Sequence, residues 1–320
     1  MSNRAYHAIP AMSHSLAVRI KQRGALVAFK ESAFNPERIE PGMSDALARG
    51  QLYHILMANP DLIENHQAKS FYENVILKPD AKKLKDEILR SISVDNTTII
   101  WVFDFGKSRT NTKYDDIFNY LCQYCKWTDD SIIVNEEELQ NAITMCRFLM
   151  VHPHYQSTVG VGTVVSREEN ILFDYQGMPC KAKPDIVLQM PTGRFMVIDY
   201  KTTKNTTREE NQLCGERLGY HIEDFVYKTA VATKYDVSVD HVDMAYLMQN
   251  KEHPEIVYLC EFGQESFEAG KTDFEVAAGD FMHRVPNFKE QGIVAFMDVC
   301  GRLQFKHWED RLLEQPDENI

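Results

Sequence analysis

The stretch Cys180–Thr203, CKAKPDIVLQMPTGRFMVIDYKTT, decides the fold of this chain. It contains two apolar runs, one starting at Asp185 and one within RFMVIDY, separated by the turn sequence Pro-Thr-Gly, which predicts a β-hairpin. Side chains alternate between the faces of a strand, so Asp199 and Lys201 are expected to share one face. The stretch therefore predicts one carboxylate on each leg of a hairpin, with a lysine beside the second.

The length and composition predict a globular protein without membrane contact. At 320 residues the chain is long enough to bury a sizeable core. Its first thirty residues lack a long apolar segment behind a basic start, and the apolar run IIWVF (Ile99–Phe103) is too short to cross a bilayer. Seven cysteines without a short-spaced framework predict reduced thiols. We therefore expect a cytoplasmic protein.

The net charge of -12 argues at first sight against a nucleic-acid partner, because Lys and Arg drive phosphate binding. Local charge matters more, since screening acts over roughly 8 Å at physiological salt. The window Lys181–Lys234 holds nine Lys or Arg and seven Asp or Glu, which makes it +2 and leaves -14 elsewhere. Within it, Lys183, Lys204 and Arg208 are our candidates for DNA contacts.

Along the chain, the pattern predicts helices, then three strands that include the two legs of the hairpin, a helix and two further strands. Helices are expected at 14–24, with a continuation beyond Gly24, at 44–59, at 136–151 with Asn135 as its cap, and at 219–234. Strands are expected at 97–103, 168–175, 180–188, 242–248 and 255–262. The chain shows no internal repeat or clear linker. We therefore expect a single domain, 1–320, with a core at about 135–262, an N-terminal helical part at 1–134 and a C-terminal helical extension at 263–320.

A PD dipeptide or a DxK triplet is weak evidence when it stands alone, and the chain contains four PD dipeptides and two DxK triplets. Pro184-Asp185 lies fourteen residues before Asp199, and each acid belongs to an apolar run with a turn between them. Asp80 and Lys82 instead lie in a polar stretch without a preceding apolar strand. The combination of Asp185, Asp199 and Lys201 is thus the one with the required context.

Two close carboxylates repel each other, and burial raises their pKa, so such a pair is stable in its ionised form only beside a cation. Oxygen ligands favour Mg²⁺ or Mn²⁺. A lysine nearby can orient water or neutralise charge that develops on a phosphoryl group, and these parts together suit phosphodiester hydrolysis. The alternative is a surface hairpin with an ordinary Asp–Lys pair, worth under ~1 kcal/mol.

The segment KAKPDIVLQMPTGRFMVIDYKTT resembles the PD-(D/E)xK nuclease superfamily, and within it the phage RecE-type exonucleases (exonuclease VIII). The segment NEEELQNAITMCRFLMVHP is also similar to the helix before the nuclease core of RecE-like proteins, so the likeness extends over about His7 to Phe262. The resemblance implies an α/β fold with a restriction-endonuclease-like core, in which helices flank a central mixed sheet, and with N-terminal helical additions.

The resemblance also implies roles for the hairpin residues. Asp185 and Asp199 would bind the metal, Lys201 would be the catalytic lysine, and the carbonyl of Tyr200 could add a ligand between them.

The same resemblance implies roles for two residues that precede the hairpin. ALARGQLYH is similar to a G-x-x-x-H helix whose histidine binds metal, which favours His54 as a ligand. By its spacing alone, His54 could equally be a histidine at the edge of a core. Glu168 falls where the family often has an acidic residue, although its neighbour Glu169 leaves the register open.

The helix after the hairpin departs from the family pattern. Q-x-x-x-Y is usual there, whereas this chain has Glu223 and Tyr227 at that spacing. An additional negative charge could favour a second metal or repel the scissile phosphate. Tyr227 could lie near substrate or be a core aromatic residue.

The sequence gives little support for a zinc site, an iron–sulfur cluster or a nucleotide cofactor. CQYC at Cys122–Cys125 has no second CxxC or histidine pair to complete a zinc site, and only Cys260 and Cys300 lie late in the chain, so we expect no iron–sulfur cluster. No Gly-rich phosphate loop appears, so we expect no nucleotide cofactor.

The hairpin chemistry and the resemblance together predict an exonuclease that depends on Mg²⁺ or Mn²⁺ and degrades linear duplex DNA for recombination or end resection. The resemblance implies a phage or prophage origin, a ring-shaped homo-oligomer and a RecT-type single-strand annealing partner. The alternatives are a non-cleaving DNA- or protein-binding module on the same fold and a DNA endonuclease or nickase.

Overall fold

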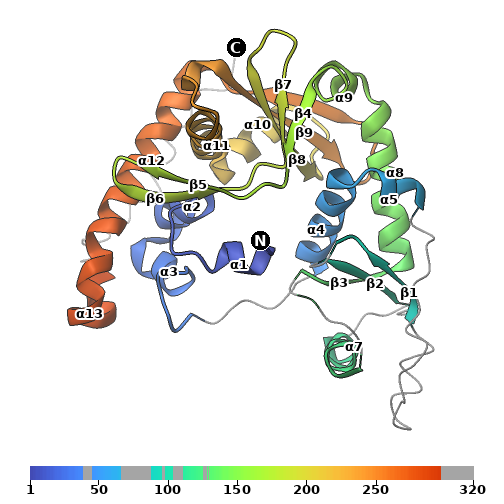
Figure 1. Ribbon diagram of the computed structural model, residues 1–320, viewed down its shortest axis with the longest axis horizontal. Coiled ribbons are helices and arrows are strands. Elements are labelled where there is room, and N and C mark those ends of the chain that lie inside the picture. Colours follow the sequence, from blue (N-terminus) through green and yellow to red (C-terminus); the bar gives the residue numbers. More distant parts are fainter. Residues whose placement is uncertain are drawn as a thin grey trace, which may run out of the picture.

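A computed structural model describes residues 1–38, 45–65, 88–95, 98–103, 111–124, 128 and 130–296. A five-stranded mixed sheet lies at its centre, with the strand order β10-β9-β8-β7-β4, and helices lie on both sides of it (Figure 1). Strands β8 and β9 are parallel and the other neighbours are antiparallel. The five strands are β4 (Thr163–Arg167), β7 (Ile186–Gln189), β8 (Phe195–Thr203), β9 (Val242–Asn250) and β10 (Val257–Glu261).

The predicted hairpin forms the middle of this sheet. Ile186 of β7 pairs with Ile198 of β8, and the connection between the two strands closes with a hydrogen bond from the N–H of Met190 to the carbonyl of Arg194. Gly193 has a φ of 83°, a left-handed conformation that glycine adopts without strain. The Pro-Thr-Gly signal therefore predicted the turn correctly.

One strand prediction is wrong, because the segment 180–188 divides between two sheets. Strand β6 (Met178–Ala182) pairs with β5 (Ile171–Tyr175) in a separate two-stranded sheet, whereas β7 belongs to the central sheet. Pro184 lies between them and has no N–H to continue a ladder. The strand expected from residue 168 begins only at Ile171, since Glu168 has a φ of 47°.

Alternation along β8 and β9 builds two apolar cores, one on each face of the sheet. Val197 and Tyr246 belong to the core shared with helices α2, α11 and α12, and Ile198 and Leu247 belong to the core shared with α4 and α8. The five helices are α2 (His14–Arg23), α4 (Asp45–Ala58), α8 (Glu136–Val151), α11 (Tyr220–Tyr235) and α12 (Gln264–Arg284).

Helix boundaries follow the capping signals of the sequence. Asn135 forms a capping box with Glu138 and begins α8 as predicted. Gly24, with a φ of 83°, separates α2 from α3 (Ala25–Lys30), which is the predicted continuation. Ser44, the expected cap of the helix that carries His54, lies outside the described residues. Helix α10 (Arg208–Leu218), between β8 and α11, was not expected from the sequence.

The N-terminal part contains a small sheet in addition to its helices. Strands β1 and β2 are antiparallel and β2 and β3 are parallel, and β2 is buried throughout, as the sequence predicted for 99–103. The elements of this part and the remaining short ones are α1 (Asn3–His7), α5 (Asp61–Asn65), β1 (Ile88–Ser93), β2 (Ile99–Phe103), α7 (Asn111–Tyr124), β3 (Ile132–Asn135), α9 (Pro153–Thr158), η2 (Val239–His241), η3 (Val285–Asn287), α13 (Phe288–Gln291) and η4 (Gly292–Phe296).

The architecture confirms the predicted fold class, a central mixed sheet flanked by helices. Within the described ranges, no helix combines the length and the apolar character needed to span a bilayer.

Candidate metal and catalytic site

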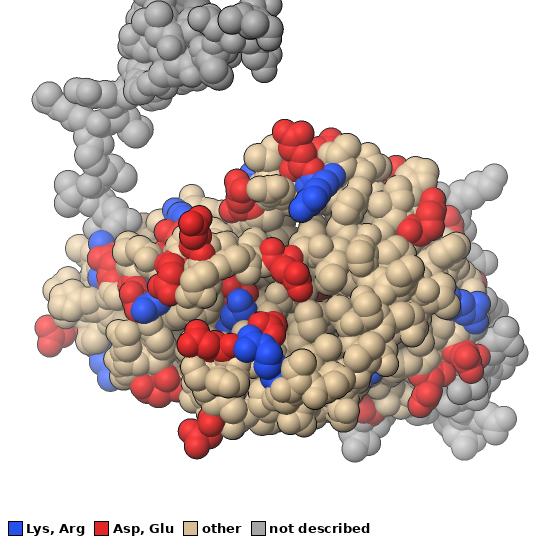
Figure 2. Space-filling model, turned by 90° about the horizontal axis from the view of Figure 1, so that it is seen from above, with Lys and Arg blue, Asp and Glu red and all other residues tan. Residues whose placement is uncertain are grey.

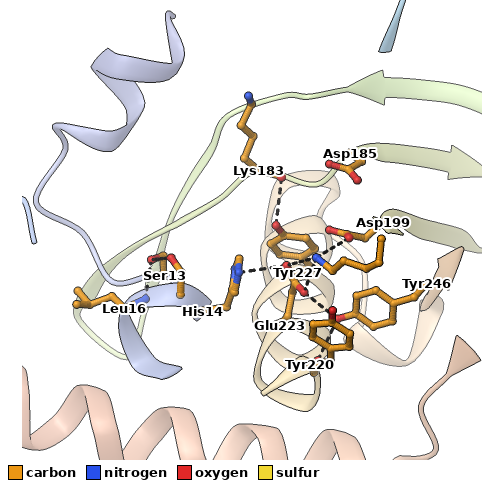
Figure 3. A network of polar contacts seen from close by, with 12 residues as sticks. Ser13, His14, Leu16, Lys183, Asp185, Asp199, Tyr220, Glu223, Tyr227 and Tyr246 are labelled. Atoms are coloured by element: carbon orange, nitrogen blue, oxygen red, sulfur yellow. Dashed lines mark hydrogen bonds and ion pairs between the residues drawn. The ribbon is translucent and has the colours of Figure 1, made fainter. Parts of the chain in front are cut away.

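Asp185 and Asp199 reach the site from neighbouring strands. Asp185 immediately precedes β7, and its Oδ2 accepts a 2.7 Å hydrogen bond from the backbone N–H of Tyr200 in β8. That bond fastens the Asp185 carboxylate to the strand that carries Asp199. Both side chains are buried, with 7% and 3% of their surface exposed, and Figure 3 shows the two carboxylates on adjacent strands.

A group of potential metal ligands forms around Asp185. His54 of α4 places its Nδ1 3.0 Å from Asp185 Oδ1 and 3.7 Å from Glu168 Oε1. Each of these three residues offers one ligand atom, and the three atoms lie within 4.8 Å of one another. An imidazole nitrogen and two carboxylate oxygens suit a divalent cation, so the donor set fits Mn²⁺ as well as Mg²⁺. The structure thus brings His54 and Glu168 to the PD aspartate.

Asp199 contacts a cation of the protein. Its Oδ1 lies 2.6 Å from Lys201 Nζ, and Lys201 follows it on the same face of β8, as strand alternation predicted. Asp199 is therefore adjacent to the His54–Glu168–Asp185 group, but its nearest partner is the lysine. A metal-ligand role for Asp199 beside Asp185 and His54 stays a prediction.

The raised pKa values of His54 and Asp199 reflect an excess of carboxylates at the site. Burial lowers the pKa of His54, but Asp185, Glu168 and Asp199 outweigh burial and raise it to about 9. Burial and the charge of Asp185 raise the pKa of Asp199, against the effect of Lys201. A proton on His54 thus supplies positive charge that a bound cation could supply instead.

Glu223 of α11 lies on the other side of Lys201. Its Oε2 is 3.1 Å from Lys201 Nζ and accepts a 3.1 Å hydrogen bond from Tyr246 Oη, while its Oε1 is 3.1 Å from His14 Nε2. Although burial raises the pKa of this carboxyl, His14, Lys201 and Tyr246 lower it overall. The Glu223 carboxylate is therefore in contact with two basic side chains, His14 and Lys201.

Sequence reasoning missed His14. It belongs to the N-terminal helix α2, far from the hairpin in sequence, and no motif or spacing marked it as part of a site. Its imidazole also makes an edge-to-face contact with Tyr227, with ring centroids 5.3 Å apart.

Tyr227 and Tyr200 contribute in different ways. The side chain of Tyr227 is buried, and its hydroxyl donates a 3.2 Å hydrogen bond to the carbonyl of Lys183, next to the PD dipeptide. Tyr227 is thus a core aromatic residue that also supports the loop before β7. Tyr200 buries its side chain in the core and uses its N–H to hold Asp185. A ligand role for the Tyr200 carbonyl stays a prediction.

The three predicted DNA contacts lie in different environments. Lys183 is half-buried and pairs with Glu168 at 2.8 Å, so it belongs to the edge of the metal-ligand group. Lys204 is exposed directly after β8. Arg208 is exposed at the start of α10. Burial raises the pKa of Cys260 in β10, and the charge of Arg208 partly offsets this effect. Their contact with DNA remains a prediction.

Two further basic residues gather near Lys204. The backbone N–H of Lys251 donates to the carbonyl of Thr203, at the adjacent ends of β8 and β9. Burial, together with the charges of Lys204 and Arg49, lowers the pKa of Lys251. Arg49 belongs to the helix that carries His54 and also pairs with Glu138 at 3.0 Å. We call Arg49, Lys204 and Lys251 the strand-end basic cluster. Sequence reasoning named only Lys204, because the other two come from distant segments.

Comparison with known proteins gives a structural likeness and no family assignment. No known family model matches the sequence, and no curated protein matches it. A crystal structure from Eubacterium rectale, named "Putative exonuclease", matches over 98% of this chain and 98% of its own, with a TM-score of 0.52 and 12% sequence identity. At this identity the likeness concerns the fold, which this chain shares with that structure.

Proposed function

We propose that the chain is a metal-dependent deoxyribonuclease, an exonuclease of the RecE type that degrades linear duplex DNA from its ends. The observation that carries the proposal is the meeting of two buried aspartates from adjacent strands with a histidine–glutamate pair on one side and a lysine on the other. The fold shared with a structure named as an exonuclease supports it.

The mechanism assigns distinct tasks to these side chains. His54, Glu168 and Asp185 would hold a divalent ion, which when bound supplies a Lewis acid and an activated water. Asp199, on the strand beside Asp185, would add a further carboxylate to this ligand set. Lys201, held between Asp199 and Glu223, would stabilise the negative charge that develops on the scissile phosphate.

DNA binding to an acidic protein requires local positive charge. Acidic and basic side chains are interspersed on the face shown in Figure 2, so this face carries no broad basic patch that would attract phosphate. The strand-end basic cluster lies beyond the end of β8, the strand that carries Asp199 and Lys201. We propose that it binds the DNA backbone next to the cleavage site.

Incubation with linear and circular duplexes, in Mg²⁺ or EDTA, tests the proposal. Loss of the linear DNA alone, abolished by EDTA and by Asp199→Ala, is the expected result. Nicked circles would indicate an endonuclease, and intact DNA of both kinds, bound in a gel-shift assay, would indicate a non-cleaving binding module.

Metal binding can be measured without cleavage. Titration calorimetry with Mn²⁺ should show binding to the wild type and a large loss of affinity in His54→Ala. His253→Ala is a suitable control, because this exposed histidine contacts Glu255 outside the site. Unchanged Mn²⁺ affinity in His54→Ala would remove this histidine from the proposed ligand set.

A further inference from the structure

Glu223 is a buried carboxylate whose two oxygens each have one partner of their own and share Lys201 as another. Only 3% of its surface is exposed, and a charge in such a place needs nearby cations and hydrogen-bond donors. Tyr246 Oη donates to Oε2, and His14 Nε2 lies against Oε1. Lys201 Nζ lies 3.1 Å from Oε2 and 3.3 Å from Oε1. The orientation of the carboxylate is therefore fixed from two sides, and the lysine meets a fixed acceptor.

His14 is itself held firmly. The residue before it, Ser13, caps α2 by accepting a hydrogen bond from the N–H of Leu16. One residue earlier, Met12 exchanges backbone hydrogen bonds with β6, from its N–H to the carbonyl of Pro179 and from the N–H of Lys181 to its carbonyl. Figure 3 shows His14 reaching from this segment toward Glu223. The imidazole is thus positioned by the fold before any substrate binds.

We infer that His14 is a positioning residue that fixes the catalytic lysine through Glu223. The Lys201 ammonium contacts two carboxylates, that of Asp199 at 2.6 Å and that of Glu223 at 3.1 Å. Its ammonium also lies 5.2 Å and 5.4 Å from the ring centroids of Tyr220 and Tyr246, two stacked tyrosines.

Removal of the His14 imidazole would change the contacts of Lys201 with Asp199 and Glu223. Oε1 of Glu223 would lose one of its two described partners, and Lys201 would remain as the other. The lysine would then shift toward Glu223 and away from the position it needs beside Asp199. The kinetic part of this inference rests on the proposed nuclease function.

Kinetic comparison of three variants tests the role. His14→Ala is expected to lower kcat roughly tenfold, the size of effect typical of residues that orient catalytic groups, with little change in KM. His14→Gln, which retains a donor at similar reach, should recover most of the lost rate. His221→Ala is the matched control, because His221 also places its Nε2 on a carboxylate, 2.8 Å from Asp273, but outside the site. Equal kcat values for His14→Ala and His221→Ala would overturn the inference.

A double-mutant cycle separates positioning from a general loss of packing. Because His14 acts through Glu223, His14→Ala should lower kcat much less in a Glu223→Gln background than in the wild type. Independent, multiplicative losses in the two backgrounds would contradict the inference.

Labelling with an amine-reactive reagent gives a readout that does not require nuclease activity. Peptide mass spectrometry should show severalfold slower labelling of Lys201 in His14→Ala, because its ammonium would pair more closely with Glu223, and unchanged labelling of Lys183, which pairs with Glu168 in the same site. Unchanged labelling of Lys201, or an equal change in both lysines, would contradict the positioning role. If the wild type cleaves no DNA, the proposed function fails, while this measurement still decides how Lys201 is held.

Discussion

Lys201 contacts carboxylates from two elements, Asp199 of β8 and Glu223 of α11, and these contacts determine its charge state. Burial lowers the pKa of this lysine, but Asp199, Glu223 and Asp185 outweigh burial and raise it well above its usual value. The side chain therefore remains an ammonium, which suits charge stabilisation better than proton abstraction.

Lys201→Met should lower kcat by roughly 100- to 1000-fold, the cost of removing one group that stabilises charge in the transition state. Mn²⁺ binding measured by calorimetry should persist, because His54, Glu168 and Asp185 remain. Lys234→Met is a useful control, since this lysine pairs with Glu169 away from the site. Cleavage within tenfold of the wild-type rate would exclude an essential role for the ammonium.

Asp224, which follows Glu223 on α11, should make the stability of the fold depend on pH. Burial raises its pKa to about 6, and the ion pair with Lys228 only partly offsets this effect. A carboxyl whose pKa is higher in the folded state stabilises the fold below its unfolded pKa of 3.8, and this contribution is lost as the pH rises through about 6. The loss amounts to about 3 kcal/mol, because each pKa unit corresponds to about 1.36 kcal/mol.

Urea unfolding of the wild type and of Asp224→Asn at pH 4 and pH 8 measures the contribution of Asp224 to the free energy of unfolding. The free energy of unfolding of the wild type should fall by about 2 kcal/mol relative to the variant between these two pH values, since part of the loss occurs below pH 4 and the amide does not titrate. A constant difference between the two proteins would show that Asp224 has an ordinary pKa.

At the scale of elements, the contact between α11 and α12 depends on one glycine. A Cβ on Gly270 would lie 2.0 Å from the carbonyl oxygen of His221, whereas Gly279 of the same helix has open space around it. Gly270→Ala should therefore cost about 1–3 kcal/mol or more through overpacking against backbone. Gly279→Ala should instead stabilise the helix by about 1 kcal/mol.

Denaturant unfolding of these two variants checks the packing. Because α11 carries Glu223, Gly270→Ala should also lower the rate of DNA cleavage, and Gly279→Ala should not. Equal stability of the two variants would mean that the helices are not packed as closely as described.

The ends of β8 and β9 carry the strand-end basic cluster, and its proposed role predicts a salt effect. Lys204→Ala and Lys251→Ala should each weaken DNA binding and reduce the slope of log affinity against log salt by about 1, as expected when one phosphate contact is lost. At saturating DNA, kcat should stay near the wild-type value, because neither side chain belongs to the catalytic group.

Fluorescence anisotropy with labelled duplex, without divalent metal and at several salt concentrations, measures these slopes. Lys289→Ala is the control, since this exposed lysine lies on α13, at the far end of α12 from the sheet (Figure 1). A slope unchanged in both cluster variants would place the DNA elsewhere.

At the scale of the whole molecule, a net charge of -12 must be reconciled with a DNA substrate. A ring of several chains, which we propose, would direct the basic side chains inward and leave the acidic surface outside. Such an enzyme would also require a free DNA end, which explains the expected preference for linear duplexes.

Light scattering combined with size exclusion should give the mass of several 37.0 kDa chains. Degradation of a long duplex should be processive, so that excess competitor added after the start has little effect. The mass of a single chain would exclude the ring without excluding the nuclease.

The sequence by itself determined the local parts of this protein. Alternation in RFMVIDYKTT placed Asp199 and Lys201 on one face, Pro-Thr-Gly gave the turn between β7 and β8, and Asn135 gave the start of α8. These features could be predicted because each depends on residues within a few positions of one another.

Only the tertiary structure decided which distant residues meet at the hairpin. It brought His54 and Glu168 to Asp185, added Lys251 and Arg49 near Lys204, and placed His14 against Glu223. It also divided the predicted strand 180–188 between two sheets. Such contacts depend on how whole helices and strands pack over the two faces of the sheet, and the periodicity of a single segment contains no information about which distant segment will cover it.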